Sequence, residues 1–220
     1  MIWWTSMKEK ILIIGNKGYL GSQLTEYLSS KKYLCKGIDI NFFDKCTLFK
    51  PKKISSKIID AYSLNENEIK KFDVVLLLAA FSNDPFKKLD PNLFYKPSEA
   101  FTYRTAKICK KNKIKMIFPS SCSVYGYGEK IFNEKSKLNP LTYYSKNKVN
   151  IENKLLKLSD NKFKPIILRL ATVFGVSARM RFDLVINMFC GMAITSREIL
   201  LNSNGLSWRP NIHIDDVCKS

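Results

Sequence analysis

A run of apolar residues followed at once by three spaced glycines constrains this chain more than any other feature of its sequence. The run Ile11–Ile14 is continuous, which is typical of a strand buried on both faces of a parallel sheet. Gly15, Gly18 and Gly21 follow at a spacing that lets the chain turn tightly, approach a pyrophosphate and pack a helix against the strand. Helical spacing over residues 21–30 places the free N–H groups of a helix N-terminus at the same point. These features predict a dinucleotide-binding turn, with a purely structural turn as the alternative.

An acidic residue after the second expected strand supports this prediction. Asp39 ends the strand 33–40, close to the spacing at which a carboxylate binds the ribose of an adenosine. Its charge would repel the 2′-phosphate of NADP, so the sequence favours NAD as the cofactor. Lys17, inside the glycine loop, weakens that preference because its ammonium would attract a phosphate.

Strands and helices alternate along the chain, and this order predicts a parallel sheet joined by crossover helices. Strands are expected at 11–14, 33–40, 57–60, 73–79, 115–119 and 165–170, and helices at 21–30, 98–112 and 143–158. We therefore predict an α/β fold with a Rossmann-type, doubly wound parallel sheet. Residues 200–208, outside the alternation, are expected to form a further strand followed by a turn.

The formal net charge of +18 points first to a nucleic-acid partner. Thirty-one of the 37 cationic residues, however, are lysines scattered over turns and helix faces, whereas phosphate-binding surfaces favour the planar fork of arginine. We interpret the charge as a compositional bias. Nucleic-acid binding, which would depend strongly on salt, stays the weaker alternative.

The cysteine, histidine and apolar patterns bear on metals, compartment and membranes. The six cysteines form no CxxC pair and His213 is the only histidine, so we predict no metal site. Free thiols are typical of a reducing compartment. The apolar N-terminal run is too short for a signal peptide, and residues 184–194 are too short to span a bilayer. We expect a cytoplasmic protein without membrane association.

A tyrosine and a lysine four residues apart indicate acid–base chemistry. Tyr144 and Lys148 fall in the expected helix 143–158, so they share one helix face. A nearby ammonium favours the phenolate and lowers the pKa of a tyrosine, which makes it a proton acceptor near neutral pH. A serine of the segment Ser120-Ser-Cys-Ser-Val-Tyr-Gly126, at the end of the strand 115–119, would orient a substrate hydroxyl. Basic helices also contain this Tyr–Lys spacing by chance, so the pair alone is a weak signal.

Together with the glycine loop, these segments resemble the extended short-chain dehydrogenase/reductase superfamily, and within it the NAD-dependent sugar-nucleotide epimerases and dehydratases. The resemblance extends from Ile11 to Val217. The segments that carry it are Gly15–Gly21, Leu78-Ala-Ala80, Ser120–Gly126, Tyr144–Lys148, Leu168-Arg-Leu-Ala-Thr-Val-Phe-Gly175 and Arg209-Pro-Asn-Ile-His-Ile-Asp-Asp-Val217. It implies a NAD-binding Rossmann domain over residues 7–175 and a small, partial substrate-binding lobe over residues 176–220.

The resemblance also implies roles for individual residues. Tyr144 would accept a proton from a sugar hydroxyl, Lys148 would hold the nicotinamide ribose and tune Tyr144, and Ser121 would take the place of the catalytic serine or threonine. Arg209 would bind the substrate diphosphate, and His213 would be structural. The implied cofactor residues are Gly15, Gly18, Tyr19, Leu20, Gly21, Asp39, Asp60, Ala61, Ala79, Ala80 and Lys148. The implied substrate residues are Ser121, Thr172, Arg179, Arg181, Asn187 and Arg209.

The sequence departs from the family pattern at three places. Cys122 and Ser123 stand where the dehydratases carry an aspartate and a glutamate that remove water, so dehydration is disfavoured. Ser98 stands near the place of a usual asparagine. Relatives continue past the segment ending at Val217. We therefore expect a truncated substrate lobe, with the apolar stretch 184–194 exposed or covered by a partner chain.

The sequence thus predicts a NAD-dependent epimerase of a nucleotide-linked sugar, which works by transient hydride transfer and a ketosugar intermediate. Two alternatives stay open. One is a truncated NAD-binding family member with little or no catalytic activity, and the other is a nucleotide-sugar reductase or dehydratase. A homodimer is a candidate assembly. The sequence names neither the sugar nor the base.

Overall fold

The computed structural model describes residues 9–51, 54–80, 90, 92–128, 131–201 and 203–220. In this part of the chain, six parallel strands form one sheet in the order β3-β2-β1-β4-β5-β6. They are β1 (Lys10–Ile14), β2 (Leu34–Asp39), β3 (Ser55–Ile58), β4 (Val74–Leu77), β5 (Lys115–Ser121) and β6 (Ile166–Leu170). The winding direction reverses between β1 and β4, and the predicted Rossmann-type doubly wound parallel sheet is confirmed.

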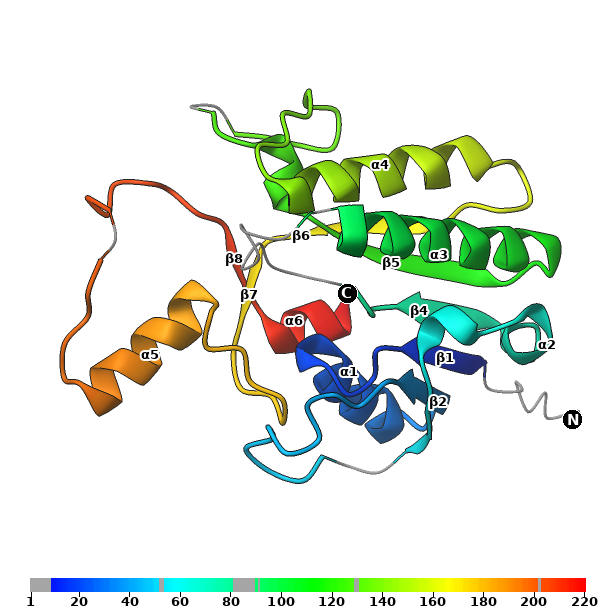
Figure 1. Cartoon of the computed structure of the whole chain (residues 1–220), viewed down its shortest axis with the longest axis horizontal. Helices are drawn as coiled ribbons and strands as arrows, with labels where there is room; N and C mark the ends of the chain where they lie inside the picture. The colour runs from blue at the N-terminus through cyan, green and yellow to red at the C-terminus, as the bar shows by residue number, and fades with distance from the viewer. Residues whose placement is uncertain (1–8, 52–53, 81–89, 91, 129–130, 202) are drawn as a thin grey trace, which may run out of the picture.

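Helices cover both faces of the sheet, with α3 and α4 together on one face and α1 and α6 on the other (Figure 1). The helices are α1 (Tyr19–Ser30), α2 (Glu66–Ile69), α3 (Asn92–Lys111), α4 (Tyr143–Leu158), α5 (Val185–Thr195) and α6 (Ile214–Lys219), with 3-10 turns η1 (Ala61–Ser63) and η2 (Cys122–Tyr125). No helix among the described residues is both long and apolar enough to cross a membrane.

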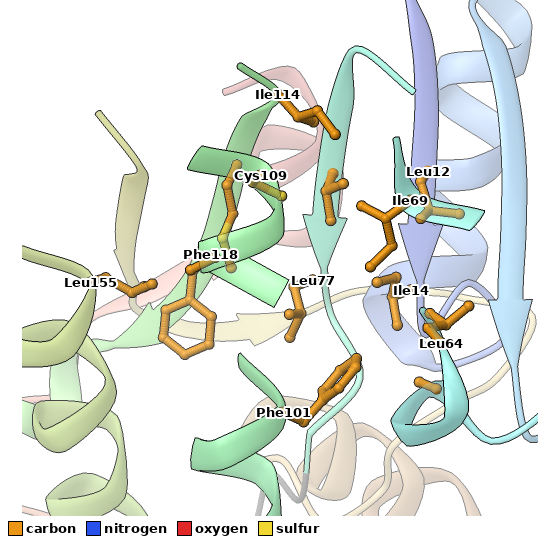
Figure 2. Close-up of a cluster of buried hydrophobic side chains, with 14 of the residues drawn as sticks. Leu12, Ile14, Leu64, Ile69, Leu77, Phe101, Cys109, Ile114, Phe118 and Leu155 are labelled. Carbon is orange, nitrogen blue, oxygen red and sulfur yellow. The ribbon is translucent and has the colours of Figure 1, made fainter. Parts of the chain in front are cut away.

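Successive side chains of the central strands enter two separate hydrophobic clusters. Ile14 of β1 and Leu77 of β4 pack with Phe101 of α3 on one face (Figure 2). Ile13, the neighbour of Ile14, packs with Leu24 of α1 on the opposite face. Both isoleucines have no exposed surface, which explains why β1 is a continuous apolar run.

A second, two-stranded parallel sheet pairs β7 (Thr172–Phe174) with β8 (Asn211–His213). It lies close to the main sheet because Tyr19 of α1 forms a small buried cluster with Met180 and Ile214. Helix α5 extends away from the main sheet beside this pair (Figure 1). Asn187 is its only buried residue, so the apolar stretch that we expected to be exposed or covered by a partner chain is at least partly accessible in this chain.

The expected strand 57–60 lies two residues earlier, as β3, and two further element predictions are wrong. Helix α3 begins at Asn92, well before the expected start at residue 98, and includes Pro97, whose ring nitrogen removes one hydrogen bond from the helix. The described residues of 200–208 form no strand, and the strand of this region is β8, because β7 offers its edge to residues 211–213.

The close packing of α1 against the end of β1 generates a prediction about two glycines. A Cβ at Gly21 would lie 2.0 Å from the carbonyl oxygen of Gly15, whereas a Cβ at Gly18 would lie 3.5 Å from the same atom. We expect Gly21→Ala to lower the free energy of unfolding by about 1–3 kcal/mol, as overpacking does. Gly18→Ala is the matched control and should cost less than about 1 kcal/mol. Urea unfolding of the two variants measures this difference, and equal losses would contradict the packing argument.

Candidate functional site

The glycine loop and the end of β2 are held together by the carboxylate of Asp39. Its Oδ2 accepts a hydrogen bond from the backbone N–H of Lys17 at 2.9 Å, and its Oδ1 accepts one from Asn41 N–H at 2.8 Å. Gly15 has a φ of +93°, and a Cβ there would lie 2.6 Å from the backbone nitrogen of Ala79. The left-handed turn and the close approach of β4 both require glycine at this position.

A cavity of about 1400 Å³ opens beside this loop. It is lined by the glycine loop, the end of β2, the chain after β4 and the segment 178–183. The sequence-predicted cofactor residues on its wall are Gly15, Gly18, Asp39, Asp60, Ala61, Ala79 and Ala80. Its volume is sufficient for a ligand larger than a typical drug molecule.

The remaining predicted cofactor residues of the loop lie in the first turn of α1. Leu20 is partly buried, and Gly21 contacts the loop backbone. The Tyr19 side chain points away from the cavity lining, since its hydroxyl donates to the carbonyl of Gly175 at 2.8 Å. Burial raises the pKa of Tyr19, whose hydroxyl also accepts a hydrogen bond from Asn187. The Tyr19 hydroxyl is therefore fully engaged in hydrogen bonds within the fold.

Two arginines predicted on the substrate side line this cavity instead. Arg179 lies with its guanidinium 4.1 Å from the ring centre of Phe43, in the loop that follows β2. Arg181 is ion-paired with Asp183, and both also line the cavity. Their position follows from a backbone hydrogen bond of 2.9 Å between Leu48 N–H and the Ala178 carbonyl, which joins the two loops. The two arginines thus share this cavity with the predicted cofactor residues, and their substrate role stays a prediction.

Asn187, also predicted on the substrate side, makes its hydrogen bonds within the fold. Its side-chain oxygen accepts from Gly175 N–H at 3.0 Å, and its amide donates to the Arg181 carbonyl and to the Tyr19 hydroxyl. The side chain is buried, and both N–H donors are used within the fold. Asn187 anchors α5 to the end of β7 and to α1, and these contacts explain a buried polar residue at this position.

Helix α4 presents Tyr144 and Lys148 toward the end of β5. A reciprocal capping pair between Thr142 and Ser145 fixes its first turn. The Lys148 ammonium lies 5.5 Å from the centre of the Tyr144 ring and donates to the Pro119 carbonyl at 2.8 Å. The structure thus brings together the predicted Tyr–Lys pair and the strand that ends at Ser121.

Lys148 carries its charge in an almost dry environment. The residue is 5% exposed, and its ammonium lies 4.5 Å from the ring centre of Phe118. Burial lowers the pKa of Lys148 to about 8, and the negative charge of Glu152 acts in the opposite direction. A lysine in this position is close to a change of charge near neutral pH.

Ser121 ends β5 and caps the 3-10 turn η2, against which α4 packs. Its hydroxyl accepts a hydrogen bond from Ser123 N–H at 3.2 Å. Burial raises the pKa of the neighbouring Cys122 thiol, while the Arg209 guanidinium acts to lower it.

Thr172 and Arg209 meet at the same place through the small sheet. The backbone N–H of Thr172 donates to the Pro210 carbonyl at 3.0 Å, directly after Arg209. Ser121, Thr172 and Arg209 therefore come from three separate parts of the sequence to one region of the fold. Among the described residues, no group of three or more histidine, cysteine or acidic side chains gathers to hold a metal ion.

A buried ion pair beside this region was not predicted from the sequence. Glu152 is 1% exposed and binds the Arg169 guanidinium, with a shortest contact of 2.7 Å. The Ser120 hydroxyl also hydrogen-bonds to Glu152. One signal was available, because Glu152 lies four residues after Lys148 and so shares its helix face.

The sequence profile described as the NAD dependent epimerase/dehydratase family matches residues 11–220. The chain is 28% identical over 235 aligned residues to a dTDP-D-glucose 4,6-dehydratase of Dictyostelium discoideum, covering 95% of this chain and 54% of that protein. It is 26% identical to an ADP-L-glycero-D-manno-heptose-6-epimerase of Brachyspira hyodysenteriae, covering 94% of this chain and 69% of the relative. The chain thus spans about half the length of the first of these relatives.

Solved structures share the fold over nearly the whole chain. TunA, a NAD-dependent NDP-hexosamine 5,6-dehydratase of tunicamycin biosynthesis, superposes with a TM-score of 0.85 at 22% identity, covering 96% of this chain and 70% of TunA. A UDP-N-acetylglucosamine 4-epimerase from Methanobrevibacter ruminantium gives 0.83 at 22% identity, over 97% of this chain and 72% of that one. A UDP-glucuronic acid 4-epimerase from Bacillus cereus in complex with NAD gives 0.79 at 24%, over 96% and 72%.

The buried ammonium of Lys148 generates a prediction about stability and pH. Its pKa is lowered from 10.5 to about 8, so protonated Lys148 costs the folded state up to about 3 kcal/mol below pH 8. Between pH 8 and 10.5 the unfolded chain binds more protons than the folded one, so this cost disappears as the pH rises. We expect Lys148→Met to raise the free energy of unfolding at pH 7 by about 1–3 kcal/mol, and the gain to shrink toward pH 10.

Urea unfolding of the wild type and Lys148→Met at pH 7 and pH 10 measures this effect. Lys146→Met is the matched control, because Lys146 is exposed on the same helix and should show no such pH dependence. A Lys148→Met protein less stable than the wild type at pH 7 would contradict the prediction.

Proposed function

The chain belongs to the NAD-dependent epimerase/dehydratase family, and from that premise we propose that it binds NAD and epimerises a nucleotide-linked sugar. The observation that carries the proposal is that buried Lys148 follows Tyr144 by one helical turn and that its ammonium binds the end of β5. This arrangement suits proton transfer at a sugar hydroxyl. Two of the relatives that the chain resembles are named for sugars linked to dTDP and to ADP, which supports a substrate of this class.

The volume of the large cavity and the glycine loop and Asp39 on its wall support dinucleotide binding, although Tyr144 and Lys148 do not line it. Gly18 lies on its wall, and a Cβ there would meet only the Gly15 carbonyl oxygen, at 3.5 Å, so the missing side chain leaves room for a pyrophosphate. The first turn of α1 supplies N–H groups and the positive end of its dipole at the same point. Asp39 would accept hydrogen bonds from the adenosine ribose, and Lys148 would bind the nicotinamide ribose.

When bound, NAD supplies the acceptor and then the donor of a hydride. Tyr144, as the phenolate, takes the proton from the sugar hydroxyl whose carbon is oxidised, and returns it to the carbonyl oxygen of the ketosugar after the sugar has turned over. The Lys148 ammonium favours that phenolate electrostatically. Ser121 orients the reacting oxygen, and Arg209 binds the diphosphate of the substrate.

Epimerisation is favoured over dehydration by the chemistry of the residues after Ser121. Water elimination needs a second acid–base pair, and Cys122 and Ser123 provide a thiol and a hydroxyl. Burial raises the pKa of Cys122, so the thiol stays protonated at neutral pH and does not replace a carboxylate. Reversible hydride transfer needs only the tyrosine, the lysine and the cofactor.

The first prediction from this proposal concerns cofactor selectivity. We expect NADH to bind at least about tenfold more tightly than NADPH, because the Asp39 carboxylate repels a 2′-phosphate. Asp39→Asn removes the charge and keeps one side-chain oxygen, which can accept from only one of the Lys17 and Asn41 N–H groups, so the affinity difference between NADH and NADPH should narrow. Fluorescence titration of the wild type and the variant with NADH and with NADPH measures the two affinities. Equal affinities in the wild type would rule out this role for Asp39.

The second prediction concerns the proton acceptor. Tyr144→Phe should reduce turnover of the sugar nucleotide about 100- to 10,000-fold and leave the Kd for NADH within about twofold. Tyr143→Phe is the matched control, because Tyr143 is the exposed neighbour on the same helix and should keep full activity. A panel of UDP-, GDP-, CDP- and dTDP-sugars identifies the substrate for the assay. An unchanged rate in Tyr144→Phe would require another base.

A further inference from the structure

Glu152 is the most buried charged side chain near the candidate site, at 1% exposure. Its oxygens bind Nε and Nη2 of Arg169 at 2.7–3.2 Å and also accept the hydroxyl of Ser120. The carboxylate is therefore held in one orientation, because three donors from two strands converge on it.

Glu152 and Lys148 reach consecutive residues of β5. Lys148 donates to the Pro119 carbonyl at 2.8 Å, and Glu152 accepts from the hydroxyl of Ser120, the next residue. The two side chains lie one turn apart on α4 and are both almost fully buried. They fix the register of α4 against the strand that ends at Ser121.

Arg169 extends the network to the chain after β5. Its Nη1 donates to the Tyr125 hydroxyl of η2 at 3.0 Å and to the Glu134 carbonyl at 3.2 Å. Burying an ion pair is a poor way to gain stability, because an apolar pair of similar volume is often as stable or more so. The pair includes Glu152, one helical turn after Lys148 on α4, and stability alone does not explain a buried ion pair at this position.

We propose that Glu152 is a positioning residue that holds the Lys148 ammonium in its charged form and aligned for Tyr144, with Arg169 keeping the Glu152 carboxylate in place. This inference rests on the proposed function for the roles of Tyr144 and Lys148. It adds to that function a buried electrostatic support that none of the site predictions contained.

The charges around Lys148 support this assignment. Helix α4 contributes Tyr144 and Glu152, and strand β6 contributes Arg169, which lies behind Glu152. The atoms that contact the ammonium from β5, the Pro119 carbonyl and the Phe118 ring, carry no charge.

Two other elements that pack against α4 also bear titratable groups. On α3, the carboxylate of Glu99 is already paired with Lys154. On η2, Cys122 has a pKa raised by burial, and the Tyr125 hydroxyl binds Arg169. Glu152 is therefore the anion that counters the burial of Lys148, and its influence opposes the lowered pKa of the lysine.

Removing Glu152 and removing Arg169 should shift the pKa of Lys148 in opposite directions. Glu152→Gln leaves the Arg169 cation behind the lysine, so the pKa of Lys148 should fall by about one unit or more. Arg169→Met leaves an uncompensated carboxylate there, so the same pKa should rise. The double variant should lie between the two single variants. A merely structural role would lower stability in both single variants without opposite effects on Lys148.

The direct measurement is an NMR titration of lysine side chains labelled with carbon-13 at Cε, with the Lys148 signal identified by its loss in Lys148→Met. Glu99→Gln is the matched control, since it breaks another carboxylate–lysine pair between α3 and α4 and should not move the signal. Shifts in the same direction for Glu152→Gln and Arg169→Met, or no shift in Glu152→Gln and in the double variant, would overturn the inference.

A second measurement connects this charge to the cofactor. NADH affinity should fall on the alkaline side as Lys148 loses its proton, and the midpoint of that fall should move to lower pH in Glu152→Gln by the amount seen in the NMR titration. The NMR measurement needs no cofactor. Absence of NADH binding in the wild type therefore counts against the proposed function, and an unmoved Lys148 signal counts against the role of Glu152.

Discussion

Burial of β1 and β4 on both faces is the constraint on which the rest of the structure depends. Their backbone groups must be paired by neighbouring strands, so the sheet continues on both sides, with parallel strands and helices on each face. The carboxyl ends of the strands then meet at one edge. The glycine loop after β1, Ala79 after β4 and Ser121 at the end of β5 all lie at this edge, so the topology places the site before any of its side chains are chosen.

The face of α4 that meets β5 departs from the apolar packing found elsewhere in the core. Phe118 and Leu155 are fully buried there, yet Lys148 and Glu152 are buried among them with their charges. Each charge has a partner: the lysine has a carbonyl and aromatic faces, and the glutamate has Arg169. A core with buried charges is less stable than an apolar one but holds its polar groups in a fixed arrangement. Many active sites differ from the rest of their folds in this way.

Sequence patterns predicted the features that depend on local chemistry. The glycine spacing, the position of Asp39 and the Tyr–Lys spacing identified segments that the fold brings to one edge of the sheet. Pairing between distant elements was not predictable in this way. The Glu152–Arg169 pair joins a helix to a strand, and Arg179 reaches Phe43 only because two loops meet. Periodicity describes which face of an element is buried, but it does not specify which side chain of another element it will meet.

The contact between the loop after β2 and the segment 176–183 has an energetic consequence. The Leu48–Ala178 hydrogen bond and the Arg179–Phe43 contact make one cavity wall from two parts of the chain. The free energy of binding a ligand that touches both loops includes the cost of holding them together. Coupling between two equilibria is reciprocal. If ordering residues 176–183 raises the affinity of the cavity for a ligand by some factor, then ligand binding raises the equilibrium constant for that ordering by the same factor. Ligand binding in the cavity and the ordering of residues 176–183 are thus thermodynamically coupled.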